Sequence, residues 1–318
     1  MKVLVLGAGA YGLALASVLN DKNKVTVYSV IEKEIDDLKK TYQNNKLFPN
    51  IELSRDINFT NNIDDSIKDT ELIIVAIPTN FIEKTIRLIE GKIGTNIPIC
   101  IASKGINNDT CMFAYDIIKN VLKTDNISVL SGPSFAIDTI KKEHIILSLA
   151  GNNLEQIKTV FPDYIKIETT SDIIGVELCG TLKNIFAISC GILEGMNASD
   201  STKSSYLTKV INETMNIIVK FNGKASTILL ACGIGDTILT CSSKKSRNFT
   251  LGYLIGSKKT KDEINNYLNN TTVEGYDAIK SIKNVFINNH INSALIDLIY
   301  DILINNENPS KLINYIVK

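Results

Sequence analysis

Short apolar runs alternate with helix-patterned stretches over the first half of the chain. Runs of this length, bounded by turn residues, are typical of strands buried in a parallel sheet. They occupy residues 3–6, 25–28, 72–77, 98–102, 129–131, 145–149 and 164–167. Beyond residue 171 they stop, and helical spacing continues with short breaks. We therefore predict an α/β protein in which a Rossmann-type doubly wound N-terminal domain, residues 1–171, precedes an all-α C-terminal domain, residues 172–318.

The predicted helical half contains a lysine in an unusual setting. Residues 175–188 are apolar with helical spacing, yet Lys183 and Asn184 lie side by side within them. On an ordinary amphipathic helix a lysine occupies the solvated face, and this interpretation stays open from the segment alone. The apolar flanks, however, leave almost no polar face for the lysine to share. Because desolvation lowers the pKa of a lysine and so suits it to proton transfer, Lys183 is a candidate acid or base.

A glycine-rich turn directly follows the first predicted strand. Residues 7–12 read G-A-G-A-Y-G and lead into a helix-forming run. In that context Gly7 permits a tight turn, Gly9 lets the backbone approach a pyrophosphate, and Gly12 lets the helix pack closely on the strand. The helix N-terminus then presents free N–H groups to phosphates. The pattern predicts a site for a dinucleotide, NAD or NADP, and its alternative is a glycine-rich turn without a ligand.

The end of the second predicted strand does not choose between the two dinucleotides. An NAD-binding fold usually offers Asp or Glu to the ribose hydroxyls at this point. Here residues 29–33 read S-V-I-E-K. Neither Val30 nor Ile31 can hydrogen-bond through its side chain, whereas Glu32 and Lys33 favour opposite cofactors.

Polar side chains follow three other predicted strands. Thr79, Lys104 and Ser134 come directly after the runs at 72–77, 98–102 and 129–131. Ligands of open α/β sheets bind outside the carboxyl ends of the strands. We therefore expect these three side chains to lie where a ligand binds.

An acid and a hydroxyl share one helical face in the second half. Asp236 and Thr240 are four residues apart, and Gly233 and Gly235 precede them. Such a pair could orient a lysine amine and a substrate hydroxyl. The alternative is an N-capping aspartate with a threonine that bonds back to the helix.

A hydroxyl, a guanidinium and an amide follow one another at Ser246, Arg247 and Asn248. Since arginine recognises phosphate bidentately, this triplet is a candidate phosphate-binding set. A solvated basic loop is an equally simple interpretation.

Composition narrows the classes of function. The formal charge is zero, with 34 basic and 34 acidic residues, which gives no support to nucleic-acid or anionic-membrane binding. The six cysteines lack C-x-x-C spacing, so we expect buried thiols in a reducing compartment and no metal ligands.

Residues 3–19 mimic a signal peptide, but they contain three glycines and no small-residue cleavage site follows them. We expect a cytoplasmic protein without a membrane span. The two histidines, His144 and His290, lack partner motifs, which strengthens Lys183 as the proton-transferring group.

The motifs together resemble those of the bacterial NAD(P)-dependent glycerol-3-phosphate dehydrogenase family, in order and spacing over almost the whole chain. The segments that carry the resemblance are residues 7–12, 102–106, 130–136, 175–184, 233–236, 239–241, 246–248 and 273–275. The resemblance implies an enzyme that transfers hydride between NAD(P) and glycerol 3-phosphate or dihydroxyacetone phosphate, feeding glycerophospholipid synthesis. It is also the sole indication of a homodimer.

Roles for individual residues come from this resemblance. Lys183 would exchange the proton of the C2 hydroxyl, together with Lys104 and Asp236 as further catalytic residues. The small phosphorylated substrate would be bound by Lys104, Gly132, Ser134, Asn184, Thr240, Ser246, Arg247 and Asn248. The nucleotide would be bound by Gly7, Gly9, Ala10, Tyr11, Gly12, Val30, Lys104, Ala136, Arg247 and Glu274. No metal is implied.

The chain departs from the family pattern at two places. Val30 stands where members often present a side chain to the adenosine ribose, and Lys203 and Lys209 stand at two positions usually held by arginine. Two other functions stay open. One is a ketopantoate reductase-like enzyme, which should lack the Ser246–Asn248 triplet, and the other is a sensor that binds NAD(P)H without catalysis.

Overall fold

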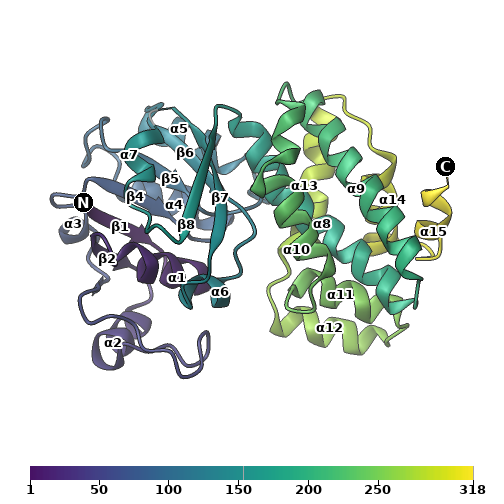
Figure 1. The fold of residues 1–318 in the computed structure, drawn as a ribbon, viewed down its shortest axis with the longest axis horizontal. Helices are drawn as coiled ribbons and strands as arrows, with labels where there is room; N and C mark the ends of the chain where they lie inside the picture. Colours follow the sequence, from purple (N-terminus) through teal and green to yellow (C-terminus); the bar gives the residue numbers. More distant parts are fainter. Residues whose placement is uncertain (153, 318) are drawn as a thin grey trace. The chain divides into compact units, whose positions relative to one another are not determined.

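The computed structural model describes residues 1–152 and 154–317. Its contacts divide the chain into two compact units (Figure 1). The first unit comprises Met1–Lys104 and Phe113–Ile173, and the second comprises Gly105–Met112 and the chain from Ile174 onward. The short segment Gly105–Met112 therefore belongs to the second unit, where the Ser281 hydroxyl donates a hydrogen bond to the Asn108 side chain over 3.1 Å.

The first unit is built on one eight-stranded sheet with the order β3-β2-β1-β4-β5-β6-β7-β8. All neighbours pair in parallel except β6 and β7, which are antiparallel. The chain runs outward from β1 in both directions, so the strand order reverses between β1 and β4. The strands are β1 (Lys2–Leu6), β2 (Lys24–Tyr28), β3 (Asn58–Thr60), β4 (Leu72–Val75), β5 (Ile99–Ile101), β6 (Ile127–Ser131), β7 (Ile145–Gly151) and β8 (Ile165–Thr170).

The predicted doubly wound fold is confirmed, and each of the seven apolar runs overlaps a strand. Leu4, Ile73 and Leu147 are fully buried, as expected for strands covered on both faces. The eighth strand, β3, was missed because it is three residues long and polar at both ends.

Short helices connect and cover these strands. α1 packs against α6, and α4 packs against α5. The helices are α1 (Ala10–Leu19), α2 (Glu32–Thr41), α3 (Ile63–Ser66), η1 (Thr79–Phe81), α4 (Ile82–Arg87), α5 (Ala114–Leu122), α6 (Ala136–Ile140) and α7 (Leu154–Lys158).

The second unit is helical, as predicted, and α8 (Ile173–Gly195) is its core. Among the described residues α8 is the one helix long and apolar enough to cross a membrane, but 89% of its most apolar window is buried inside the protein. The other elements of this unit are α9 (Asp200–Lys220), η2 (Ala225–Leu229), η3 (Ala231–Gly235), α10 (Asp236–Ser242), α11 (Arg247–Gly256), α12 (Lys261–Asn270), α13 (Glu274–Asn288), α14 (Ala294–Ile304) and α15 (Lys311–Ile316).

Glycines let α8 and α11 pack backbone against backbone. A Cβ atom on Gly191 would lie 2.0 Å from the Phe249 carbonyl oxygen, and one on Gly252 would lie 1.8 Å from that of Ile188. Both distances are far below van der Waals contact, so glycine is required at these crossings. The close approach fixes α11 against the helix that carries Lys183.

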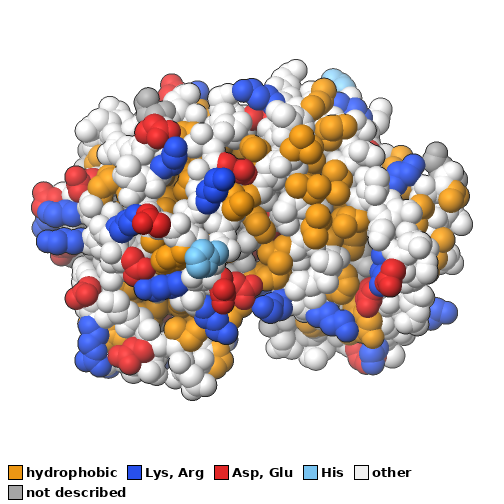
Figure 2. Space-filling view, viewed as in Figure 1, with side chains coloured by type: hydrophobic (Ala, Val, Ile, Leu, Met, Phe, Trp, Pro, Cys, Tyr) orange, Lys and Arg blue, Asp and Glu red, His pale blue; other side chains and the backbone are white. Residues whose placement is uncertain are grey.

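Charged side chains of both signs are interspersed over the face in Figure 2, which agrees with the zero formal charge of the chain.

Candidate active site

The glycine-rich turn lies at the switch point of the sheet. Gly7 has a φ of +121°, and a Cβ there would lie 2.4 Å from the Ala76 carbonyl oxygen at the end of β4. A Cβ on Gly12 would lie 2.1 Å from the Gly7 carbonyl oxygen. At Gly9, by contrast, a Cβ would meet none of the described atoms within 4 Å. Gly7 and Gly12 therefore serve the turn itself, whereas Gly9 borders open space.

These three glycines fit a dinucleotide. Open space at Gly9 lets a pyrophosphate approach the backbone, and α1 starts at the next residue, Ala10. The first N–H groups of a helix lack partners within the helix, and the helix dipole favours a negative charge there. The turn thus has the conformation and the donors that phosphate binding needs.

Four residues predicted for the site meet around one carbonyl group. The Lys104 ammonium and the Ser134 hydroxyl donate hydrogen bonds to the Gly132 carbonyl oxygen over 3.3 and 3.2 Å. The hydroxyls of Tyr11 and Ser134 lie 2.8 Å apart. Thr79 supports the group, because its hydroxyl donates to the Lys104 carbonyl over 3.0 Å. Side chains that follow β4, β5 and β6 therefore gather, together with Tyr11 of α1, at the edge where the carboxyl ends of these parallel strands lie.

Ala136 begins α6 two residues after Ser134. It is partly buried and lies beside the core of the first unit.

The second unit buries a lysine against an acid. Lys183 on α8 is 7% exposed, and its ammonium lies 2.6 Å from the Asp236 carboxylate and 3.1 Å from the Thr240 hydroxyl. Asp236 is 1% exposed and opens α10. Burial disfavours the charged form of the lysine, whereas the adjacent carboxylate favours it. The two contacts hold the Lys183 amine in one position inside the helical unit.

Local structure brings the acid to this position. The π-helical turn η3 precedes Asp236, and a Cβ on Gly233 would lie 2.2 Å from the Ile228 carbonyl oxygen. The hydroxyl of Thr240 donates to the Asp236 carbonyl over 2.7 Å. The predicted back-bonding of Thr240 is therefore confirmed, and it coexists with the contact to the lysine. The other half of that alternative is wrong, because the N-cap of α10 is Gly235 and Asp236 lies inside the helix with its carboxylate on Lys183.

A second polar network adjoins the lysine. The Asn184 amide donates to the Glu274 carboxylate over 2.9 Å and accepts from the Asn248 amide over 3.1 Å. The Asn248 side-chain oxygen Oδ1 accepts from the Gly275 N–H over 2.9 Å. Because Asn184 follows Lys183 on α8, one helix links both networks.

The members of the triplet at 246–248 have three different environments. Ser246 is 4% exposed and caps α11, accepting a hydrogen bond from the Phe249 N–H over 3.2 Å. Asn248 is buried in the network above. The Arg247 side chain is 55% exposed, and its guanidinium lies 3.8 Å from the Glu274 carboxylate. Arg247 is thus the member that is open to solvent.

At the end of β2 the structure places Glu34, a residue that the sequence analysis did not consider. Val30 is 67% exposed, and its side chain cannot hydrogen-bond. The Ser29 hydroxyl instead donates to the Glu34 carboxylate over 2.9 Å. The missed signal was a carboxylate on the first turn of the following helix, which can fold back toward the strand end.

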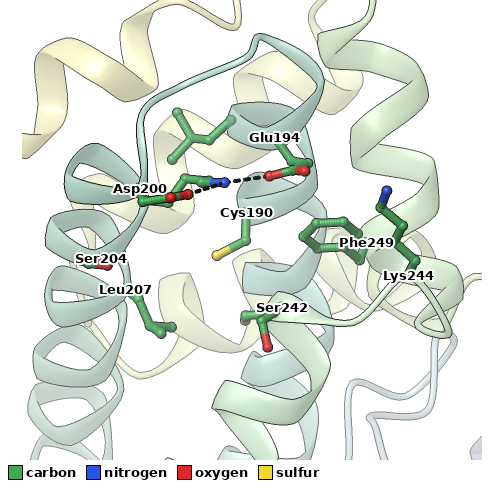
Figure 3. Close-up of a pocket in the computed structure, with 11 residues that line it drawn as sticks. Cys190, Glu194, Asp200, Ser204, Leu207, Ser242, Lys244 and Phe249 are labelled. Atoms are coloured by element: carbon green, nitrogen blue, oxygen red, sulfur yellow. Dashed lines mark hydrogen bonds and ion pairs between the residues drawn. The ribbon is translucent and has the colours of Figure 1, made fainter.

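Lys203, one of the two lysines at usual arginine positions, lines a pocket of about 430 Å³ in the helical unit (Figure 3). Its ammonium lies 2.7 Å from the Glu194 carboxylate and 2.9 Å from that of Asp200. Cys190 and Cys241 also line this pocket, and the hydrogen bond between their thiols and burial raise the pKa of Cys241. Through its ion pairs with Glu194 and Asp200, Lys203 joins the start of α9 to the end of α8.

Other candidate groups are distributed as follows. His144 and His290 are both exposed. Five of the six cysteines are buried, and all six are free thiols. Within residues 1–152 and 154–317, no three His, Cys, Asp or Glu side chains form a group that could hold a metal ion.

A mostly parallel sheet with a glycine turn at its switch point, followed along the chain by a helical unit that buries an ion-paired lysine, is typical of a nicotinamide-nucleotide-dependent dehydrogenase. The family model for the NAD-dependent glycerol-3-phosphate dehydrogenase N-terminus matches residues 2–157, and the one for its C-terminus matches residues 172–314. This chain belongs to the NAD-dependent glycerol-3-phosphate dehydrogenase family.

Individual relatives agree with this assignment. The chain is 33% identical to glycerol-3-phosphate dehydrogenase (NAD(P)+) of Fusobacterium nucleatum, over 99% of this chain and 96% of the relative. It is 32% identical to the enzyme of the same name from Mesoplasma florum, over 99% and 97%. The crystal structure of glycerol-3-phosphate dehydrogenase from Coxiella burnetii superposes with a TM-score of 0.91 at 25% identity, covering 100% of this chain and 98% of that one.

Proposed function

We propose that this protein interconverts dihydroxyacetone phosphate and sn-glycerol 3-phosphate, with NAD or NADP as the redox cofactor. The observation that carries the proposal is the Lys183 ammonium, buried 2.6 Å from the Asp236 carboxylate and 3.1 Å from the Thr240 hydroxyl. Family membership supports the substrate. The buried lysine supplies a group that can exchange a proton with an alcohol oxygen.

The first unit would hold the cofactor. When bound, NADH or NADPH supplies a hydride to the carbonyl carbon of the ketone. The open space at Gly9 receives the pyrophosphate, and Gly7 and Gly12 maintain the turn. The N–H groups at the start of α1 bind the phosphates. From the family resemblance we assign further nucleotide contacts to Ala10, Tyr11, Val30, Lys104, Ala136, Arg247 and Glu274.

Lys183 would move the proton. In the reducing direction its ammonium donates a proton to the carbonyl oxygen as that oxygen becomes a hydroxyl. In the oxidising direction the neutral amine accepts the proton of the C2 hydroxyl. Asp236 favours the protonated state, and Thr240 restricts the direction in which the ammonium points. Positioned general acid–base groups of this kind contribute roughly 10²- to 10⁴-fold to rates.

Arg247 would bind the substrate phosphate. Its side chain is 55% exposed and lies 3.8 Å from Glu274, a distance longer than a direct hydrogen bond. The guanidinium can therefore turn both of its N–H edges to a phosphate, which is a stronger partner. Lys104 is assigned a contact to both substrate and cofactor. The other assigned substrate contacts are Gly132, Ser134, Asn184, Thr240, Ser246 and Asn248.

In the cell, the protein would act in the cytoplasm and reduce dihydroxyacetone phosphate to supply glycerol 3-phosphate for glycerophospholipid synthesis. We also infer a homodimer from the family resemblance, which sedimentation of the purified protein measures directly.

The test is oxidation of NADH and of NADPH by the purified protein with dihydroxyacetone phosphate, at equal cofactor concentrations. The expected result is loss of the reduced nicotinamide absorbance with at least one cofactor, and formation of glycerol 3-phosphate. No oxidation with either cofactor contradicts the proposal.

Two controls separate the other candidate functions. A ketopantoate reductase-like enzyme would turn over a 2-keto carboxylate faster than the phosphate ester. A sensor would bind NADH or NADPH but oxidise it with neither substrate.

A further inference from the structure

The carboxylate of Glu34 is held at the end of β2, where a dinucleotide fold meets the adenosine ribose. The Ser29 hydroxyl, in the first residue after β2, donates a hydrogen bond to this carboxylate over 2.9 Å. The same hydroxyl accepts from the Ile31 N–H over 3.3 Å, which fixes the turn between β2 and α2. Ser29 is itself 8% exposed. The acid is therefore anchored to the strand end and does not move freely in solvent.

The glycine turn and this acid belong to one local structure. The Gly7 N–H donates to the Tyr28 carbonyl over 2.8 Å, and Tyr28 is the last residue of β2. The pyrophosphate-binding turn is thus bonded directly to the residue that precedes Ser29. A dinucleotide seated on that turn brings its adenosine ribose to the strand end that carries Glu34.

The local charge disfavours a second phosphate. Accommodation of the NADP 2′-phosphate usually requires a nearby arginine. The sequence contains three arginines, Arg55, Arg87 and Arg247. Arg55 and Arg87 are the two in the first unit, and they pair with Glu52 and with Glu83 and Glu90, respectively. Arg247 is the residue assigned above to the substrate phosphate. Residues 29–34 contain one lysine, the exposed Lys33, against two acids.

Burial and hydrogen bonding act on Glu34 in opposite directions. Burial raises the pKa of the Glu34 carboxyl, while the hydrogen bond from Ser29 lowers it. A half-buried carboxylate accepts a hydrogen bond from a ribose hydroxyl strongly, since less water competes for it. A 2′-phosphate at the same position would place roughly two additional negative charges beside the Glu34 carboxylate.

We propose that Glu34, positioned by Ser29, is the residue that makes this enzyme select NADH over NADPH. The carboxylate accepts a hydrogen bond from the 2′-hydroxyl of NADH and repels the 2′-phosphate of NADPH. This inference rests on the proposed dehydrogenase function and adds the cofactor preference that the sequence at residues 29–33 left open.

The test is titration of the full-length protein with NADH and with NADPH, with the dissociation constants measured by calorimetry without substrate. We expect NADH to bind about tenfold or more tightly than NADPH, the range of one short-range charge interaction. Glu34→Gln should weaken NADH binding and tighten NADPH binding. Ser29→Ala should reduce the ratio of the two constants by a smaller factor, because the acid stays but loses its anchor.

Glu32→Gln is the matched control. It removes an equal charge from the same first turn of α2, at an exposed position. It should leave the preference nearly unchanged. Equal binding of both cofactors to the unmodified protein, or equal shifts from the Glu32 and Glu34 variants, would overturn the proposal. If neither NADH nor NADPH binds, the proposed dehydrogenase function itself is contradicted.

Discussion

The two units of this protein build their candidate site residues in different ways. The first unit uses backbone: a turn with Gly7 at a φ of +121°, open space at Gly9 and the start of α1. The second unit uses charged and polar side chains taken out of water, with Lys183 and Asp236 exposed by 7% and 1%. A backbone site depends on short local sequence, whereas a buried side-chain network depends on residues that only folding assembles. Substitutions in the two units should therefore fail in different ways.

The largest effect should come from Lys183→Ala. Removal of the proton donor should lower kcat for dihydroxyacetone phosphate reduction by roughly 10²- to 10⁴-fold, while NADH still binds to the first unit. Steady-state rates and an NADH titration measure the two properties separately. Near-normal turnover would refute the role of the lysine.

The matched control is Lys203→Ala, which removes another ion-paired lysine of the helical unit from a half-buried position. Its kcat should stay close to that of the unmodified protein, which distinguishes loss of this particular ammonium from a general loss of charge.

Asp236→Asn should have the next largest effect. Without the opposite charge, the buried ammonium loses its proton more easily, so the pH above which ketone reduction declines should move downward. Breaking a buried ion pair also costs roughly 3–5 kcal/mol of folding stability. The kcat–pH profile and thermal melting measure the two effects. An unchanged profile with a lowered melting temperature would leave Asp236 a purely structural role.

Two glycine substitutions compare the units directly. Gly9→Ala introduces a methyl group into open space, so the melting temperature should hold while dinucleotide binding weakens about tenfold or more, the equivalent of about 1.4 kcal/mol. Gly252→Ala places a Cβ 1.8 Å from the Ile188 carbonyl oxygen and should cost roughly 1–3 kcal/mol of stability. Equal changes in melting temperature would show that the two glycines do not differ in role.

The smallest effect should come from Tyr11→Phe, which removes the hydroxyl 2.8 Å from Ser134. A hydrogen bond that is partly accessible to water contributes about 0.5–1.5 kcal/mol. Dinucleotide affinity should fall several-fold with kcat nearly unchanged. A large fall in kcat would mean that this hydroxyl acts on the substrate and not on the nucleotide.

Local patterns along the chain were sufficient for much of this structure. Apolar runs of strand length predicted seven of the eight strands, and β3 was missed because its three residues carry almost no pattern. The spacing of Gly7, Gly9 and Gly12 predicted the turn, since the φ of +121° at Gly7 and the close approach of Gly12 to Gly7 are constraints within the turn itself. The apolar flanks of Lys183 predicted its burial for the same reason.

Only the tertiary structure decided what these residues contact. Lys183 and Asp236 are 53 positions apart, and no local pattern encodes their 2.6 Å contact. The triplet at 246–248 suggested one cluster, but helix packing turned Asn248 inward to Asn184 and left Arg247 in solvent. Glu34 reached the end of β2 because the first turn of α2 folds back on Ser29. Sequence by itself determined the elements and the chemical groups available. Partners distant in sequence, and the burial that sets their charge, depend on packing between elements, which the folded chain alone provides.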